Sequence, residues 1–141
     1  MAVLPSAASP VHSCRTPMQK RILIADDHRS VLRGVRVMLE AHKDWTVCGE
    51  ALNGYEAITK AVELRPDLIV LDFAMPDLDG LQTADEISKL LPGVQIVLHT
   101  IHGADVVLEA NRHGISRVIQ KAKSGALVSA VAELLNPEHQ D

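Results

Sequence analysis

Two acidic positions, each at the end of an apolar run, are the residues best suited to chemistry in this chain. The run Ile22–Ala25 ends at Asp26 and Asp27, and the run Leu68–Leu71 ends at Asp72. Short runs rich in β-branched residues are typical of strands buried on both faces of a parallel sheet. Ligands of such sheets bind beyond the carboxyl ends of the strands. The three acids therefore indicate a candidate site at that edge.

These carboxylates would repel one another if they met without a cation. At about 4 Å and an effective dielectric constant near 20, each ionised pair costs roughly 4 kcal/mol. A bound divalent cation removes that repulsion. A shell made of carboxylate oxygens, water and a substrate phosphate favours Mg²⁺. The sequence therefore predicts a shallow magnesium site.

Apolar periodicity predicts strands and helices that alternate around the acids. A helical stripe follows the first acidic pair and predicts a helix from about 28 to 41: Val31, Leu32, Val35, Met38 and Leu39. Four later strands are predicted near 46–51, 68–72, 94–98 and 117–120. The later helices are predicted near 54–64, 81–90, 104–113 and 125–135.

This alternation specifies parallel strands that are joined by right-handed helical crossovers. The predicted fold class is α/β: a doubly wound, five-stranded parallel sheet in a flavodoxin-like, three-layer sandwich. Strand order 2-1-3-4-5 is favoured because it places the first and third strands side by side at the switch point. In this order Asp26, Asp27 and Asp72 converge, whereas in another order the two acidic positions lie far apart.

Composition restricts the classes of function. The chain has 141 residues, 47% of them hydrophobic, which suffices for one domain with a sizeable core and contains no membrane span. Its net charge of −4 and its single Trp, Tyr and Phe disfavour nucleic-acid binding. Phosphate neutralisation needs a basic face, and base stacking needs aromatic side chains. Protein or small-molecule partners are favoured, with no direct contact to nucleic acid or membrane.

The ends of the chain differ in composition from its middle. Residues 1–19 are rich in Ser, Ala and Pro and lack the features of a secretory signal, so a disordered leader is expected there. The predicted domain comprises residues 20–136, and residues 137–141 form a polar tail. Cys14 and Cys48 do not suggest a disulfide framework and are interpreted as free thiols of a cytoplasmic protein.

Thr100 and Lys121 extend the acidic pattern because they follow the fourth and fifth predicted strands. Together with Asp26, Asp27 and Asp72, they make about four-fifths of the chain resemble the receiver domain of a two-component response regulator. The combination is specific, although no single piece would be. Each residue alone has an ordinary explanation: an acidic pair at a strand end usually caps the next helix.

The run Asp26-Asp27-His28, together with Gly49-Glu50-Ala51 and Asn53-Gly54, is similar to the NarL and FixJ branch of this family. That branch normally carries a DNA-binding helix-turn-helix after the receiver. The chain is expected either to be a single-domain regulator that acts through protein contacts or to be a truncated form. Its sequence leaves both possibilities open.

The resemblance implies a role for each acid. Asp72 would be the nucleophile that accepts a phosphoryl group from a sensor histidine kinase or a histidine phosphotransfer protein. Asp27 and Asp72 would ligate Mg²⁺ directly, and the backbone carbonyl of Ala74 would supply a third protein oxygen. Asp26 would act through a water molecule. The domain is thus expected to be a signalling module and not an enzyme, apart from its own phosphoryl transfer and slow autodephosphorylation.

Lys121 and Thr100 would contact the phosphoryl group itself. The ammonium group of Lys121 would pair with Asp72 before transfer and with a phosphoryl oxygen afterwards. The hydroxyl of Thr100 would donate to another phosphoryl oxygen, and this bond couples chemistry to movement. The resemblance implies that the moving face consists of the fourth helix, fifth strand and fifth helix, where a downstream protein or a second copy would bind.

Three positions affect how such a switch would work. Val118 stands where the family usually carries a Tyr or Phe that swings inward, and Ala122 replaces the Pro that commonly follows the lysine. We predict a trans Lys121–Ala122 bond, because a cis bond without proline costs roughly 2.5–4 kcal/mol. Ala74 offers no amide or acid that could orient a hydrolytic water, so a long-lived acyl phosphate is expected.

Other functions compete with this interpretation. Val118 and Ala122 favour a constitutive pseudo-receiver that binds partners without phosphorylation, whereas the presence of all five pocket residues disfavours it. A Mg²⁺-dependent phosphohydrolase would also use an acid at a strand end, but it lacks a second acid two residues beyond Asp72. A transition-metal site built from His28, His99 and His102 lacks tight ligand spacing, and His28 is interpreted as opening the first helix.

Overall fold

The computed structural model describes residues 19–101, 106 and 109–136. Its strands are β1 (Lys20–Ala25), β2 (Trp45–Ala51), β3 (Leu68–Leu71), β4 (Gln95–Thr100) and β5 (Arg117–Gln120). Its helices are α3 (Arg29–Glu40), α4 (Gly54–Leu64), α5 (Gly80–Leu90), the short 3₁₀ helix η1 (Asn111–His113) and α7 (Ser124–Leu135). The predicted leader before Gln19 and the polar tail lie outside the described residues.

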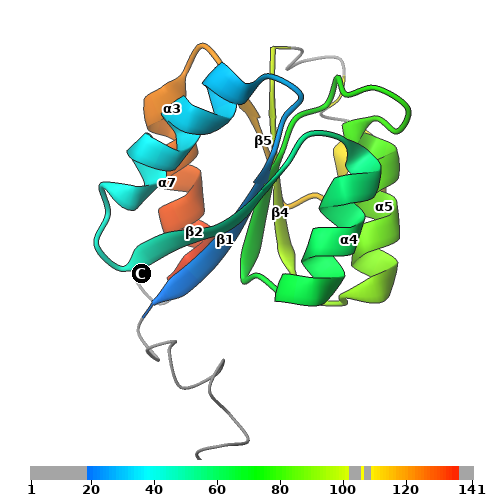
Figure 1. Cartoon of the computed structure of the whole chain (residues 1–141), viewed down its shortest axis with the longest axis horizontal. Helices are drawn as coiled ribbons and strands as arrows, with labels where there is room; N and C mark the ends of the chain where they lie inside the picture. Colours follow the sequence, from blue (N-terminus) through cyan, green and yellow to red (C-terminus); the bar gives the residue numbers. More distant parts are fainter. Residues whose placement is uncertain (1–18, 102–105, 107–108, 137–141) are drawn as a thin grey trace, which may run out of the picture.

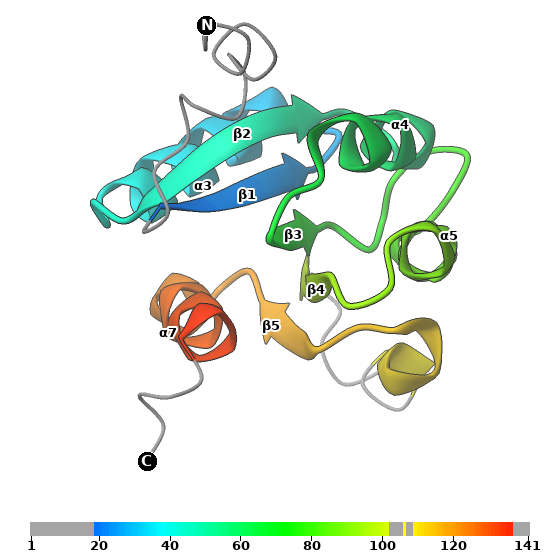
Figure 2. The ribbon, with the colours of Figure 1, turned by 90° about the horizontal axis from the view of Figure 1, so that it is seen from below.

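The five strands form one parallel sheet in the order β2-β1-β3-β4-β5. Helices α3 and α7 cover one face of the sheet, and α4 and α5 cover the other (Figure 1, Figure 2). The predicted fold class, strand order and three-layer arrangement are therefore confirmed. No helix within the described ranges is long and apolar enough to cross a membrane.

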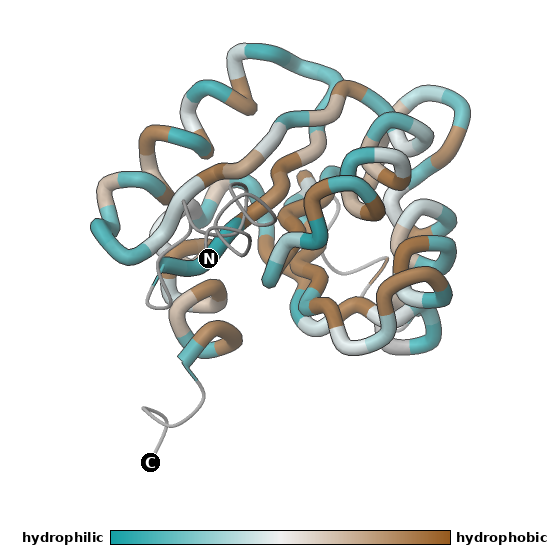
Figure 3. The backbone as a smooth tube through the Cα atoms, turned by 60° about the horizontal axis from the view of Figure 1, so that its bottom comes forward, coloured by the Kyte–Doolittle hydropathy of each residue, from teal (hydrophilic) through white to brown (hydrophobic). Residues whose placement is uncertain are grey.

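Side-chain alternation along the central strands fills two cores. Leu23, Ile69 and Leu98 face the core under α4 and α5, whereas Ile24 and Val70 face the core under α3 and α7. Both faces of the sheet are covered, so the central strands are apolar almost throughout. The helices have only one buried side, and in Figure 3 they alternate between hydrophobic and hydrophilic segments along their length.

The predicted end of the fourth strand was wrong. The apolar run suggested a strand over 94–98, but β4 continues through His99 to Thr100. Both polar side chains are buried, with 5% and 0% of their surface exposed. The helix predicted over 104–113 is represented by Val106, by 109–110 and by η1, and the rest of it lies outside the described residues.

Local side chains start two of the helices. The Asn53 side chain precedes α4 and accepts a hydrogen bond of 2.8 Å from the backbone N–H of Glu56. Asp79 precedes α5 and forms a capping box with Gln82, in which each side chain accepts from the other residue's backbone N–H. His28 precedes α3 as predicted, but its side chain makes no capping hydrogen bond.

The only tryptophan of the chain lies where the strands begin, at the opposite end of the sheet from Asp26 and Asp72. Trp45 begins β2, where it pairs with Lys20 at the start of β1. Its side chain is buried in the core under α3 and α7, and its ring stacks on His42 with a centroid distance of 3.9 Å and an interplanar angle of 8°.

Candidate functional site

Asp26 and Asp72 meet where β1 and β3 end. The strand register pairs Ala25 with Leu71, so the next residues, Asp26 and Asp72, lie side by side. Their backbones are fixed, because Asp72 N–H donates to the carbonyl of Ala25 and Asp26 N–H donates to the carbonyl of Ala51, each over 3.0 Å. Both side chains are buried, with residue exposures of 3% and 4%.

Lys121 follows β5 and reaches both buried acids. Its Nζ lies 2.8 Å from Asp26 Oδ2 and 3.2 Å from Asp72 Oδ1. The backbone N–H of Lys121 donates to the carbonyl of Thr100 over 2.8 Å, which holds the end of β5 against the end of β4. The predicted pairing with Asp72 is present, but the shorter contact is with Asp26.

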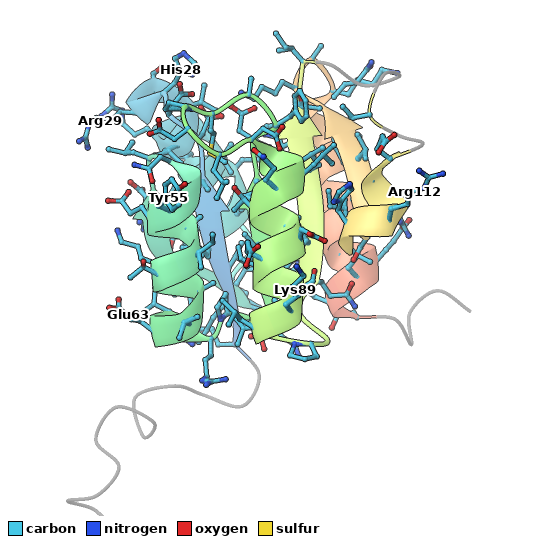
Figure 4. All side chains as sticks on the ribbon, turned by 90° about the vertical axis from the view of Figure 1, so that its right-hand side faces the viewer. His28, Arg29, Tyr55, Glu63, Lys89 and Arg112 are labelled. Atoms are coloured by element: carbon cyan, nitrogen blue, oxygen red, sulfur yellow. The ribbon has the colours of Figure 1, made fainter. Side chains whose placement is uncertain are left out.

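Asp27 and His28 form the outer part of the site. Nδ1 of His28 lies 3.1 Å from Asp26 Oδ1 and 3.0 Å from Asp27 Oδ1. Among the residues that the structure describes, these three are a group whose potential ligand atoms all lie within 4.8 Å of one another. Figure 4 shows His28 at the rim of the molecule beside Arg29, the first residue of α3.

The loop from β3 to α5 folds back onto the backbone of Asp72. The N–H of Gly80 donates to the carbonyl of Phe73 over 2.8 Å. A Cβ atom at position 80 would lie 2.6 Å from the Asp72 carbonyl oxygen and 2.8 Å from the Phe73 Cα atom. Only glycine allows this approach. The loop also carries Ala74, which is exposed, and Met75, which is buried in the core.

Thr100 and Val118 lie on neighbouring strands, with Val118 paired to Leu98, two residues before Thr100. Thr100 is the last residue of β4 and is fully buried. Val118 packs against the core under α4 and α5. No peptide bond among the described residues is cis, so the predicted trans bond between Lys121 and Ala122 is confirmed. His102 lies outside the described residues.

The site holds more negative charge than its lysine balances. Burial and the neighbouring Asp26 carboxylate raise the pKa of Asp72, although Lys121 opposes this shift. Burial would lower the pKa of Lys121, but the hydrogen bond to Asp26 and the two carboxylate charges raise it. A donor set of carboxylate oxygens beside a backbone carbonyl fits Mg²⁺, whose added charge would relieve the repulsion between the acids.

His99 is the neighbour that sequence reasoning undervalued. The register pairs Leu71 with Leu98, so Asp72 and His99 lie side by side on adjacent strands. Burial lowers the pKa of His99 to about 4, and Lys121 contributes to this shift. The one sequence signal is an imidazole directly after the apolar run that ends at Leu98, and on sequence alone this imidazole is considered only as a possible metal ligand.

Comparison with known proteins supports the predicted family. Residues 22–132 match the family described as the response regulator receiver domain. The chain is 35% identical over 123 residues to the response regulator protein VraR of Staphylococcus saprophyticus, which covers 86% of this chain and 59% of that protein. It is 37% identical over 134 residues to a protein-glutamate methylesterase/protein-glutamine glutaminase of Maricaulis maris, which covers 92% of this chain and 32% of that protein.

Solved structures give the same result. A two-component response regulator of the LuxR family from Aurantimonas sp. SI85-9A1 superposes with a TM-score of 0.79 at 30% identity, covering 84% of this chain and 86% of that one. The VraR protein and the Aurantimonas protein are response regulators of the LuxR and NarL type, which confirms the predicted branch. The chain spans less than two thirds of the length of either curated relative.

Proposed function

The chain belongs to the family of response regulator receiver domains, the signalling modules of two-component systems, and we propose that its Asp72 accepts a phosphoryl group from a phosphohistidine. The donor would be a sensor histidine kinase or a histidine phosphotransfer protein. The observation that supports this proposal most directly is the position of Lys121, which joins Asp26 and Asp72 across the ends of three strands.

In the proposed step, a carboxylate oxygen of Asp72 forms a bond to phosphorus as the phosphorus–nitrogen bond of the donor breaks. The departing imidazole keeps the electron pair of that bond and takes up a proton from water, and Asp72 becomes an acyl phosphate. Phosphoryl transfer of this kind depends on positioning and on charge neutralisation more than on covalent chemistry by the protein. Lys121 is within reach of an oxygen on Asp72 and can neutralise part of the charge that arrives there.

Mg²⁺ would be held by side chains and one backbone oxygen at the strand ends. Asp27 and Asp72 would bind it directly together with the carbonyl oxygen of Ala74, while Asp26 would act through a water molecule. When bound, the ion would supply positive charge to the phosphoryl oxygens. The shared position of Asp26 and Asp72 at one edge supports this assignment.

Thr100 would connect the phosphoryl group to a binding surface. Its hydroxyl would donate to a phosphoryl oxygen, and the pull on the end of β4 would shift the helix that follows, together with β5 and α7. A downstream protein or a second copy would bind this face, and the coupling free energy between phosphorylation and that binding would be about 1–3 kcal/mol. Val118 cannot act as an aromatic reporter, so the shift is proposed to travel through the backbone.

The Maricaulis relative is named as an enzyme, but the chain matches about a third of its length. We propose that the receiver has a regulatory role and carries no methylesterase or glutaminase activity of its own. The constitutive pseudo-receiver is the competing function, and it predicts the same fold with no phosphoryl adduct.

Intact-mass spectrometry after incubation with Mg²⁺ and acetyl phosphate tests the proposal. We expect an added phosphoryl group on wild type and on Asp77→Asn, but not on Asp72→Asn and not in EDTA. Asp77 is the matched control because it is exposed in the same loop, with a φ of 71° that asparagine also tolerates. Equal adducts on Asp72→Asn would contradict the proposal, and no adduct from either acetyl phosphate or a phosphohistidine donor would favour the pseudo-receiver.

A further inference from the structure

A buried imidazole lies beside the acids and has no part in the proposed phosphoryl transfer. His99 is 5% exposed, and its Nε2 atom has no hydrogen-bond partner among the described residues. Burying a polar atom without a partner destabilises a fold, so such an atom in a core calls for an explanation. An apolar side chain would suit this position better if packing were its only role.

The register places His99 in one row with the acids. Ala25, Leu71 and Leu98 are paired across β1, β3 and β4, so the residues that follow them form the next row: Asp26, Asp72 and His99. Residues two positions earlier on these strands, such as Ile24 and Val97, belong to the core under α3 and α7. Alternation along the strands therefore directs the whole row toward that face.

A small cavity is lined by both the imidazole and one of the acids. Its lining includes His99 and Asp26, and apolar side chains such as Ile24, Leu32 and Val35 complete it. The cavity leaves about 10 Å³ for the centre of a water molecule, which is close to the minimum for one ordered water. A carboxylate and an imidazole are the polar partners that such a water needs.

We propose that His99 is a positioning residue which, through one water bound in this cavity, fixes the Asp26 carboxylate for Lys121 and the cation. This inference rests on the proposed function, because it concerns the same site. The asymmetry of the site supports it: Asp26 Oδ2 receives Lys121, and Oδ1 receives the backbone N–H of His28 over 2.9 Å. A small rotation of this carboxylate would disturb both contacts.

The charge state of the imidazole agrees with such a role. Burial lowers the pKa of His99 to about 4, so the ring is neutral at pH 7 and adds no second cation beside Lys121. In the proposed arrangement the imidazole contacts the water and not the ion. His99 thus resembles the outer-layer partners that orient metal ligands in other proteins.

Two substitutions separate this role from simple packing. His99→Leu fills the space but cannot hold the water, whereas His99→Asn keeps hydrogen-bonding groups but fills the space poorly. We expect His99→Leu to unfold at a higher temperature in EDTA than wild type, and yet to bind Mg²⁺ about 10-fold more weakly and accept phosphoryl groups more slowly. His99→Asn should be less stable than wild type but bind Mg²⁺ more tightly than His99→Leu.

Val97→Ala is the matched control, because Val97 lies on the same strand and faces the same core. It should lower stability and leave the Mg²⁺ dissociation constant unchanged. Long-range ¹H–¹⁵N spectra add a test without a substitution at 99: the ring nitrogens of His99 should shift in Asp26→Asn and stay in place in Val97→Ala.

Equal Mg²⁺ affinity in wild type and His99→Leu, or a His99→Leu variant that binds Mg²⁺ more tightly than His99→Asn, would overturn the inference. An unchanged His99 ring spectrum in Asp26→Asn would also overturn it. Failure of the inference about His99 can be distinguished from failure of the proposed function. If wild type binds Mg²⁺ but never gains a phosphoryl group, phosphoacceptance is wrong, while the Mg²⁺ affinities of the variants still decide the role of His99.

Discussion

Lys121 donates a hydrogen bond of 2.8 Å to Asp26, an acid that lies 95 residues earlier in the chain. The same ammonium group is 3.2 Å from Asp72, the residue proposed to react. The lysine is therefore held mainly by the acid that does not react. This arrangement leaves the Asp72 carboxylate less tightly paired, while the cation is already in position to meet an arriving phosphoryl group.

Replacing Lys121 by Met should affect ion binding and phosphoryl transfer in opposite directions. Without the ammonium group, the two buried acids attract a divalent cation more strongly, so Mg²⁺ should bind several-fold more tightly. Phosphoryl transfer should slow about 100-fold, because a preorganised positive group is lost. Isothermal titration and adduct formation with acetyl phosphate measure the two effects. Lys123→Met, an exposed lysine in the same loop, should change neither, and weaker Mg²⁺ binding by Lys121→Met would contradict the prediction.

Replacing Gly80 by Ala should destabilise the fold at the site. The new Cβ would lie 2.6 Å from the Asp72 carbonyl oxygen, so the loop must move. We expect a loss of about 1–3 kcal/mol in the free energy of unfolding, together with slower phosphorylation. The control is Gly34→Ala in α3, where no atom lies within 4 Å of the new Cβ. The free energy of unfolding of that variant, measured by thermal unfolding, should rise by up to about 1 kcal/mol. Similar losses of stability in both variants would disprove the steric explanation.

Replacing Ala74 by Asn should shorten the life of the acyl phosphate. Ala74 is exposed two residues beyond Asp72, and an amide there could orient a hydrolytic water. We expect phosphoryl loss to accelerate about 10-fold while the free energy of unfolding changes little. The decay of the mass adduct after removal of acetyl phosphate gives the rate, with Asp77→Asn as the exposed control in the same loop. An unchanged decay would show that water access does not limit hydrolysis.

The stability of the domain should fall in mild acid because of His99. Its pKa of about 4 in the folded state lies below the usual value of 6.5, so between these values only the unfolded chain binds the proton. Stability should therefore decrease as pH falls from 6.5 to 4, by up to about 3 kcal/mol from this group. Urea unfolding in EDTA should show a smaller decrease for His99→Leu and His99→Asn, neither of which titrates. Parallel pH curves for all three proteins would exclude His99 as the cause.

Apolar patterns were sufficient to predict most of the architecture. The runs Ile22–Ala25 and Leu68–Leu71 mark β1 and β3, because strands buried on both faces tolerate few polar residues. The strand order was chosen because it places the first and third strands side by side at the switch point, and the convergence of the two acidic positions followed from it. The proximity of Asp26 and Asp72 is thus a consequence of topology, and topology was accessible from the sequence.

Contacts that depend on side-chain direction were not accessible. A helix starting near residue 81 was predicted, but not that Gly80 would approach the carbonyl of Asp72. The apolar pattern ended the fourth strand too early, because it cannot tell a buried histidine from an exposed one. The preference of Lys121 for Asp26 depends on a difference of 0.4 Å between 2.8 and 3.2 Å, which spacing cannot resolve.

The position of the single tryptophan gives the protein a built-in optical reporter of folding. Trp45 is buried at the start of β2, at the opposite end of the sheet from Asp72. Its emission should change when the core opens and should be insensitive to chemistry at the acids. Fluorescence can therefore follow unfolding of every variant described above without interference from the ion or the phosphoryl group. A defect in folding can then be measured separately from a defect in signalling.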